Sequence, residues 1–313
     1  MDLSIVIVNW NTKNLLLQCL TSIYGKIGEQ GIEVFVVDNG STDGSREVVE
    51  EEFPDVKLIQ NEKNLGFAVA NNKALRLSKG KYLLLLNPDT QVKEGTVEKL
   101  VSFMEIHPDA GITGAQLLNS DGSKQNSIAN FPSLATELLS KSLLRRLFPK
   151  QFPGKERENP NPIEVESVIG ACMMVKRDAM EQVGLLDEDY FLFLEETDWC
   201  LRMNKAGWKI YYVPQAEIVH LQGKSANLVR AKAKIEYYRS LYLFFEKHRG
   251  AVQTLILKML FFIRFSVDFI IAALACLFTL FMQERFKRRL LIYGRLLYWH
   301  FRFCPKGMGL RET

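Results

Sequence analysis

YLLLLNPD, residues 82–89, is the most informative segment for the fold, because an apolar strand runs directly into a polar turn there. Further predicted strands, at residues 3–8, 34–37 and 56–59, are each followed by a segment with helical spacing of its apolar residues. Strands that alternate with helices predict an α/β protein whose sheet is mostly parallel and covered by helices. Ligands of such sheets bind beyond the carboxyl ends of the strands. The polar loops that follow these runs are therefore the expected location of a binding site.

The middle of the chain is less regular. Asp121-Gly122 predicts a hairpin turn between strands at 112–118 and 124–128, and the sheet is expected to resume over 165–175. Between these strands, residues 131–164 are interpreted as a mobile excursion near an acceptor site.

We expect two domains, a catalytic one at residues 1–226 and a helical, basic and apolar region at 227–313. Residues 230–313 contain 16 Lys and Arg against 5 Asp and Glu, although the net charge of the whole chain is only +4. Their uncharged run, 269–282, is shorter than the about 20 residues that span a bilayer, and the basic cluster 284–289 follows it. The pattern favours a membrane surface, with a helix that either spans the bilayer or lies on it. The alternative is a helical hairpin packed on the body or on a second subunit in a homo-oligomer.

Composition and charge exclude several classes of protein. Because the basic region is also apolar, the pattern argues against a nucleic-acid partner. The five cysteines include no CxxC pair, which argues against a zinc site and against a disulfide framework. The start of the chain shows no secretory signal. We therefore expect the protein at the cytoplasmic face of the cell membrane.

Two acidic residues follow predicted strands and are candidates for donor binding. Asp38 can accept hydrogen bonds from a nucleotide base or a ribose hydroxyl, or it can cap the following turn together with Asn39. The loop after residue 8 has no glycine, which argues against a nicotinamide dinucleotide. Asp89 can offer a hard oxygen ligand to a divalent metal shared with substrate phosphates. Its alternative role is a type I turn with proline at the second position.

Three further acids begin a predicted helix at 195–206. Acidic residues are electrostatically favoured in a first turn, so some of them need no other function. Asp198 and Arg202 are four residues apart and predict a helical salt bridge. Glu196 has Cys200 at that spacing, which makes Glu196 the acid least explained by local structure and the candidate general base.

His220 follows a strand-like segment at 217–219. A lone histidine is more often structural than a ligand. Its position just after the end of the sheet nevertheless makes it a candidate second ligand for a metal at Asp89.

In their order and spacing, these segments resemble the inverting family 2 glycosyltransferases with the GT-A fold, from about residue 3 to about residue 250. The motifs that carry the resemblance, with His220, are IVIVNWN (5–11), VDNGSTDGS (37–45), NLGFA (64–68), LNPDT (86–90), GACMM (170–174) and EETD (195–198). The segment at 237–250 is similar to the bacterial rhamnosyltransferase-type subgroup.

The resemblance implies a role for each matching residue. Those that would bind the nucleotide-sugar, with Asp38 on the nucleoside, are Asn9, Asn11, Asp38, Asn39, Asn64, Gly66, Asn87 and Asp89. Asp89 and His220 would hold Mg²⁺ or Mn²⁺, bridged to the diphosphate. Glu196 would be the catalytic base, and the residues expected on the acceptor side are Gly170, Ala171, Glu195 and Asp198. Two positions depart from the family pattern, because Asn87 replaces the first Asp of D-x-D and Glu196 stands where Asp is commoner.

The implied activity is inverting transfer of a sugar from a nucleotide-diphosphate donor to a hydroxyl of a saccharide or lipid-linked saccharide. The expected setting is the synthesis of envelope polysaccharide, with dTDP-L-rhamnose as the first candidate donor. The alternative is a non-catalytic, membrane-associated module that binds nucleotide-sugars. A sugar-phosphate nucleotidyltransferase is disfavoured, because no glycine-rich loop with a basic pair follows the first strand.

Overall fold

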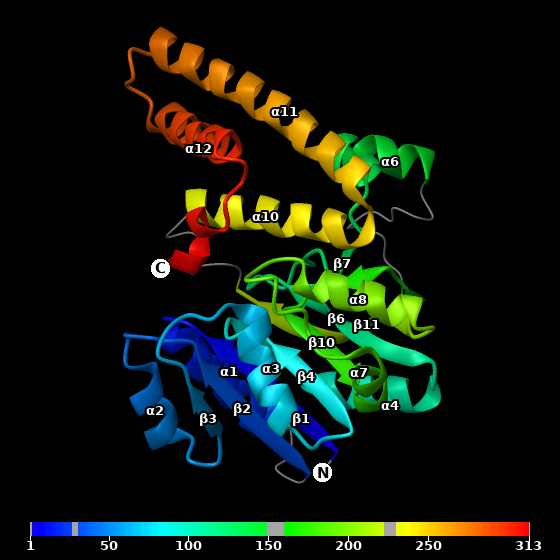
Figure 1. Ribbon diagram of the computed structural model, residues 1–313. Helices are drawn as coiled ribbons and strands as arrows, with labels where there is room; N and C mark the ends of the chain where they lie inside the picture. The colour runs from blue at the N-terminus through cyan, green and yellow to red at the C-terminus, as the bar shows by residue number, and fades with distance from the viewer. Residues whose placement is uncertain (1, 27–30, 149–159, 222–229, 313) are drawn as a thin grey trace. The chain divides into compact units, whose positions relative to one another are not determined.

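The computed structural model describes residues 2–26, 31–148, 160–221 and 230–312 (Figure 1). The chain divides into two compact units. The sheet unit comprises residues 1–131, 139–190 and 195–225, and the helical unit comprises residues 132–138, 191–194 and 226–313.

The sheet unit contains one large sheet and one two-stranded sheet. Its strands are β1 (Leu3–Asn9), β2 (Ile32–Asp38), β3 (Lys57–Gln60), β4 (Tyr82–Leu86), β5 (Thr90–Val92), β6 (Ala110–Leu118), β7 (Ile128–Ala129), β8 (Ile163–Glu164), β9 (Ser167–Val168), β10 (Cys172–Lys176) and β11 (Lys209–His220). The large sheet has the order β3-β2-β1-β4-β10-β6-β11-β5, with β8 paired to β11. The first four strands pair in parallel, as do β6 and β11. β10, β5 and β8 are antiparallel to their neighbours, so the sheet is mixed.

Helices cover both faces of the large sheet (Figure 1). They are α1 (Lys13–Lys26), α2 (Ser45–Glu52), α3 (Phe67–Leu77), α4 (Thr96–Ile106), α7 (Arg177–Val183) and α8 (Glu195–Lys205), with α6 (Lys141–Leu147) in the same unit. α1, α2 and α4 pack on the face that carries Ile5 and Ile7, and α3, α7 and α8 pack on the face that carries Val6 and Val8. Every residue of β1 and of β4 is buried, as expected for strands covered on both sides.

The hairpin predicted at Asp121-Gly122 forms only in part. Gly122 adopts a φ of 82° in a tight turn, but residues 124–128 do not return as a continuous strand and keep a single bridge at Lys124. The buried side chains of Gln125 and Ser127 bond to the backbone of β6 instead, with Ser127 Oγ accepting from Leu117 N–H at 2.8 Å. Only one isolated bridge forms, so the prediction of a strand at 124–128 is wrong.

The sheet resumes over 165–175 as expected, but in two strands, because a turn at 170–171 divides the segment. β9 pairs with β7 in the small sheet, and β10 belongs to the large sheet. The predicted excursion at 131–164 contains α5 (Leu134–Leu138) and α6, while 149–159 lie outside the described residues.

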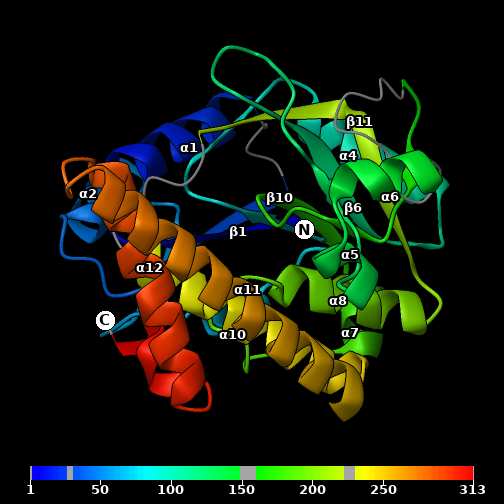
Figure 2. The same cartoon turned by 90° about the horizontal axis from the view of Figure 1, so that it is seen from above.

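The helical unit contains α5 and three longer helices, α10 (Arg230–His248), α11 (Ala251–Phe278) and α12 (Glu284–Phe301), followed by the short helices η1 (Lys306–Met308) and η2 (Leu310–Glu312). Figures 1 and 2 show α11 and α12 side by side as a hairpin. Aromatic rings join the three helices: the ring of Tyr238 lies 4.8 Å from that of Phe265, and Tyr242 stacks on Trp299 at 5.7 Å. Among the described residues, α11 is the one helix long and apolar enough to cross a membrane.

Candidate active site

The predicted site residues of the sheet unit lie at one edge of the large sheet, because of the register in which its strands pair. β1 and β2 end together, with Asn9 opposite Asp38. β4 ends at Leu86, opposite the first residue of antiparallel β10, Cys172. β11 is parallel to β6 and ends at His220. The loops after β1, β2, β4 and β11 therefore meet at the carboxyl edge, where ligands of such sheets bind.

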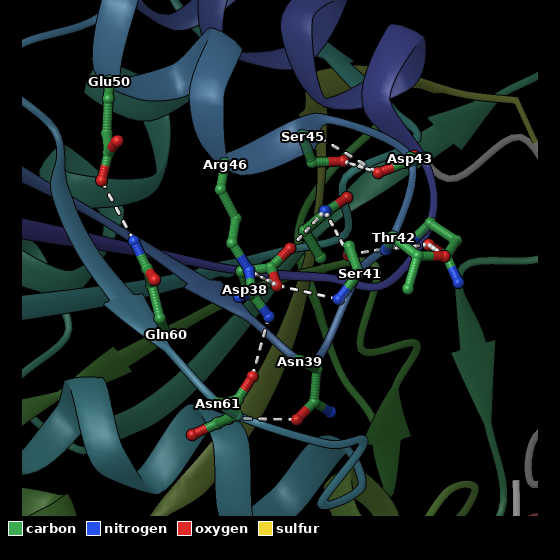
Figure 3. A network of polar contacts seen from close by, with 12 residues as sticks. Asp38, Asn39, Ser41, Thr42, Asp43, Ser45, Arg46, Glu50, Gln60 and Asn61 are labelled. Atoms are coloured by element: carbon green, nitrogen blue, oxygen red, sulfur yellow. Dashed lines mark hydrogen bonds and ion pairs between the residues drawn. The ribbon is translucent and has the colours of Figure 1, made fainter.

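Asp38 is buried at the end of β2, with 1% of its surface exposed (Figure 3). Its Oδ1 accepts from Arg46 Nε at 2.7 Å and from Ser41 N–H at 2.9 Å, and its Oδ2 accepts from Asn9 Nδ2 at 3.1 Å. Burial alone would raise the pKa of this carboxyl, but hydrogen bonds from Ser41, Arg46 and Asn9 outweigh burial, and its pKa is lowered. Asp38 is therefore ionised at neutral pH and ties the loops after β1 and β2 together.

The other predicted asparagines also connect loops at this edge. Asn39 Nδ2 donates to Asn64 Oδ1 at 2.9 Å and to the carbonyl of Gly66 at 3.2 Å. Asn11 Oδ1 accepts from Thr42 N–H at 2.8 Å. These hydrogen bonds connect the loops at the edge where a donor is predicted to bind. Their contact with a nucleotide-sugar stays a prediction.

The side chains of Asp89 and His220 face each other, with 3.4 Å between Asp89 Oδ1 and His220 Nε2. Antiparallel β5 and β11 place Thr90 opposite His220, and Leu221 N–H donates to the carbonyl of Asp89 at 2.9 Å. The side chains of both residues are 13–14% exposed, so a small ligand can reach them.

Gln125 contacts His220 from the other side and is 7% exposed. Its Nε2 donates to the carbonyl of His220 at 2.6 Å and to Asn119 Oδ1 at 2.8 Å, which fixes its Oε1 toward His220 Nδ1 at 3.0 Å. Because an amide oxygen only accepts, this contact requires a proton on Nδ1. In the neutral ring, Nε2 then presents a lone pair toward Asp89.

Asp89 and His220 fit a divalent cation. A lone pair and a carboxylate oxygen that face each other at 3.4 Å are favourable only when a cation or a proton lies between them. Carboxylate and imidazole are suitable ligands for Mg²⁺ or Mn²⁺. Over the described part of the chain, no cluster of three or more His, Cys, Asp or Glu side chains is placed to hold a metal.

The first turn of α8 contains Glu195, Glu196 and Asp198. The predicted salt bridge is confirmed: Asp198, 1% exposed, accepts from Arg202 Nε at 2.7 Å. Arg202 also donates to the carbonyl of Val183 at 3.3 Å, which links α8 to α7. Glu195 is 5% exposed. The salt bridge with Arg202 therefore gives Asp198 a structural role.

Glu196 is partly buried and lies beside Gly170. A Cβ atom at Gly170 would be 3.4 Å from both Cβ and Cγ of Glu196. The next carbonyl, that of Ala171, accepts from Asn87 N–H at 3.1 Å. The turn at 170–171 therefore contacts the helix that bears Glu196 and also the strand end that leads to Asp89.

Sequence reasoning missed Arg46 and Gln125. Arg46 is the second residue of α2, just past the loop that begins with Asp38, so only its charge indicated a partner. Gln125 is 95 residues from His220 in the sequence, and nothing in its surroundings indicates that contact.

The chain belongs to glycosyl transferase family 2, whose model matches residues 4–184. The protein is therefore a glycosyltransferase, and the expected family and GT-A fold are confirmed.

Its relatives include two rhamnosyltransferases. The N-acetylglucosaminyl-diphospho-decaprenol L-rhamnosyltransferase of Mycobacterium tuberculosis is 31% identical over 238 residues, covering 71% of this chain and 77% of the relative. The dTDP-rhamnosyl transferase RfbF of Shigella flexneri is 27% identical over 243 residues, covering 75% of this chain and 76% of the relative. The resemblance to the rhamnosyltransferase subgroup is thereby confirmed. A structure of GalNAc-T7 with UDP, GalNAc and Mn²⁺ superposes with a TM-score of 0.55 at 18% identity, over 71% of this chain and 44% of that one.

Proposed function

We propose that this glycosyltransferase moves L-rhamnose, with inversion, from dTDP-rhamnose to a hydroxyl of a lipid-linked saccharide during synthesis of a cell-envelope glycan. The observation that carries the proposal is the arrangement of Asp89 against His220, held by Gln125, at the carboxyl edge of a family 2 sheet. Both rhamnosyltransferase relatives support the sugar, the Shigella relative supports the nucleotide, and the mycobacterial relative supports a lipid-linked acceptor.

Asp89 and His220 hold the divalent cation in this proposal. Mg²⁺ and Mn²⁺ both suit the two ligands, and the GalNAc-T7 structure contains Mn²⁺. When bound, the cation offsets the negative charge of the departing nucleotide diphosphate. Gln125 keeps Nε2 of His220 directed at that position.

The remaining donor residues bind the nucleotide-sugar at the same edge. The proposed donor-binding set, with Asp38 contacting the nucleoside, is Asn9, Asn11, Asp38, Asn39, Asn64, Gly66 and Asn87. The ionised state of Asp38 supports this role, because a carboxylate accepts hydrogen bonds from base N–H groups and ribose hydroxyls.

Glu196 is the proposed general base. It removes the proton of the acceptor hydroxyl as that oxygen attacks the anomeric carbon on the face opposite the diphosphate, so the configuration inverts. Gly170 and Ala171 line the acceptor side next to it, because a side chain at Gly170 would contact Glu196. We propose that the neighbouring acids Glu195 and Asp198 orient this turn of α8.

We further propose that the sheet unit, within residues 1–226, carries the reaction and that residues 227–313 keep the enzyme at the cytoplasmic face of the membrane. A lipid-linked acceptor requires the enzyme to work at a membrane surface. The alternative, a homo-oligomer formed through the same helices, is distinguished by the test described in the next subsection.

The proposal is tested by incubating the purified full-length protein with a panel of nucleotide-sugars and a lipid-linked saccharide, with Mn²⁺ or with excess chelator. We expect transfer from dTDP-rhamnose with the metal, and none with chelator or in a folded Asp89→Ala variant. Transfer of another sugar would overturn the donor assignment. Full transfer in chelator would overturn the metal site. Donor binding without transfer to any saccharide would instead support a non-catalytic binding module.

A further inference from the structure

One face of α11 is apolar and exposed along most of its length. Its apolar stripe, defined as Leu255, Met259, Ile263, Val267, Ile270 and Leu274, recurs every three or four residues, and each member is 49–60% exposed. The spacing places all six side chains on one side of the helix. The turn after α11 continues the exposed apolar surface, because Leu280 and Met282 are each 81% exposed.

The opposite face of α11 packs inside the helical unit. Leu257, Phe261 and Phe265 are at most 2% exposed, and rings of Tyr238 and Phe261 lie 5.1 Å apart. A Cβ atom at Gly294 of α12 would be 3.3 Å from the ring of Phe269, so the hairpin helices approach closely there. α11 therefore shows its stripe outward while it remains attached to α10 and α12.

The charged residues of α11 lie away from the stripe. Lys258 pairs with Glu246 of α10 at 2.8 Å, and Arg264 lies 4.0 Å from Asp268 on the same helix. If α11 crossed a bilayer, all three of its charged groups would enter or approach the hydrocarbon, which is unfavourable. If α11 lies in the membrane plane, these groups stay at the level of the headgroups.

α12 adds a basic rim to this surface. Residues 284–302 contain six Lys and Arg and one acid, Glu284. Arg288, Arg295 and Arg302 recur at seven-residue spacing, which places them on one face of the helix. Tyr298 is 53% exposed between them, and its hydroxyl accepts from Arg302 Nη1 at 3.0 Å. Arginine and tyrosine beside exposed apolar residues are typical of helices that lie at a membrane interface.

We infer that α11 and α12 form a monotopic membrane-binding surface, with the apolar stripe of α11 buried among lipid chains and α12 against anionic headgroups. The charge of α12 favours an anionic bilayer over a second copy of the chain, because a two-fold contact would bring the same basic rims together. This surface is independent of which sugar is transferred, because vesicle binding is measured without donor.

The test uses the purified full-length protein and vesicles of phosphatidylcholine with or without about one third phosphatidylglycerol. We expect flotation with the anionic vesicles and weaker binding at high salt. Ile263→Gln with Ile270→Gln should lower the partition coefficient at least tenfold. The matched control is Leu77→Gln with Ile106→Gln, two apolar residues of the sheet unit that are 58% and 74% exposed. We expect the control pair to bind as the unmodified protein does.

A second measurement separates lying on the bilayer from crossing it. A tag at the C-terminus should remain fully accessible to protease when the protein is reconstituted with its sheet unit outside the vesicles. A protected tag would mean that α11 spans the membrane and would overturn the inference. The inference would also be overturned if the stripe pair and the control pair of substitutions lowered vesicle binding equally. A lipid-free dimer that the stripe pair dissociates would overturn it too, because that result would assign the stripe to a second copy.

Discussion

Gln125 and His220 form a fixed pair in which each side chain has a defined role. Gln125 Oε1 lies 3.0 Å from His220 Nδ1, and Gln125 Nε2 donates to the carbonyl of the same histidine at 2.6 Å. The amide therefore fixes both the position of His220 and the nitrogen that carries its proton. Metal-binding histidines commonly have such a partner on their second nitrogen.

Replacing Gln125 by Leu should weaken metal binding by roughly 10–100-fold, because the ring of His220 loses the group that orients it. Mn²⁺ binding in the presence of a nucleoside diphosphate, followed by electron paramagnetic resonance, measures the change. Nitrogen NMR of His220 should show the Nδ1–H tautomer in the unmodified protein and a mixture in the variant.

Gln91→Leu is the matched control, because Gln91 lies on β5 and bonds to Gln18 rather than to His220. Its metal affinity should equal that of the unmodified protein. An unchanged metal affinity in Gln125→Leu, in a folded protein, would contradict the role given to Gln125.

Glu196→Gln preserves the size of the side chain but removes its ability to accept a proton. We expect the rate of transfer to fall by roughly 10²–10⁴-fold, with donor affinity little changed. Asp198→Asn should mainly lower the free energy of unfolding, by about 1.5–3 kcal/mol, because it weakens a charge-assisted bond to Arg202. Initial rates, donor titration and urea unfolding of both variants separate these roles. If the Asp198→Asn variant folds but is inactive, and the Glu196→Gln variant transfers at a nearly normal rate, the general base is Asp198 and not Glu196.

Gly170 limits the space beside Glu196. The Gly170→Ala variant should transfer sugar at a nearly normal rate, because its Cβ atom would lie 3.4 Å from Glu196, an ordinary contact distance. Gly170→Val adds methyl groups that must displace the Glu196 side chain, so transfer should fall while donor affinity is retained. Gly25→Val is the control, because a Cβ atom there meets no atom within 4 Å. Normal transfer by Gly170→Val would show that this turn does not position the base.

The Arg46–Asp38 pair predicts a particular response to acid. The pKa of Asp38 is lowered in the folded protein, so its stabilising contribution is present above the unfolded value of about 3.9 and is lost as the pH falls through the folded value. Arg46→Met should therefore be less stable by about 1.5–3 kcal/mol near pH 7. That difference should hold down to about pH 5 and shrink only below about pH 4.

Thermal unfolding of both proteins across this pH range measures the difference. Arg76→Met, whose partner Glu188 is 42% exposed, is the control and should cost less than about 1 kcal/mol. A difference that disappears between pH 7 and pH 5 would assign the effect to another group.

The sequence predicted the parts of the fold that depend on local pattern. Continuous apolar runs such as 82–86 became strands buried on both faces, and the four-residue spacing of Asp198 and Arg202 became a salt bridge. The return strand at 124–128 failed because Gln125 has a partner 95 residues away that a local pattern does not show. Asp121-Gly122 suited a hairpin turn, but the side chains of Gln125 and Ser127 that follow it bond to the backbone of β6.

The candidate site was predictable to a similar degree. Parallel strands end at a common edge, so the convergence of Asp38, Asp89 and His220 on that edge followed from their positions after strands. The partners that fix these side chains, Arg46 and Gln125, are set by packing between distant segments. Their identity became visible only in three dimensions.

The stereochemistry of the newly formed glycosidic bond distinguishes a single displacement from a double one. The product made from dTDP-rhamnose in the presence of Mn²⁺ is isolated, and its anomeric configuration is read by proton and carbon NMR. We expect a single product whose anomeric configuration is opposite to that of the donor, because one displacement assisted by Glu196 inverts the carbon once. A product with the donor's own configuration would require two displacements or a different mechanism, and it would rule out Glu196 as the base of a single inverting displacement.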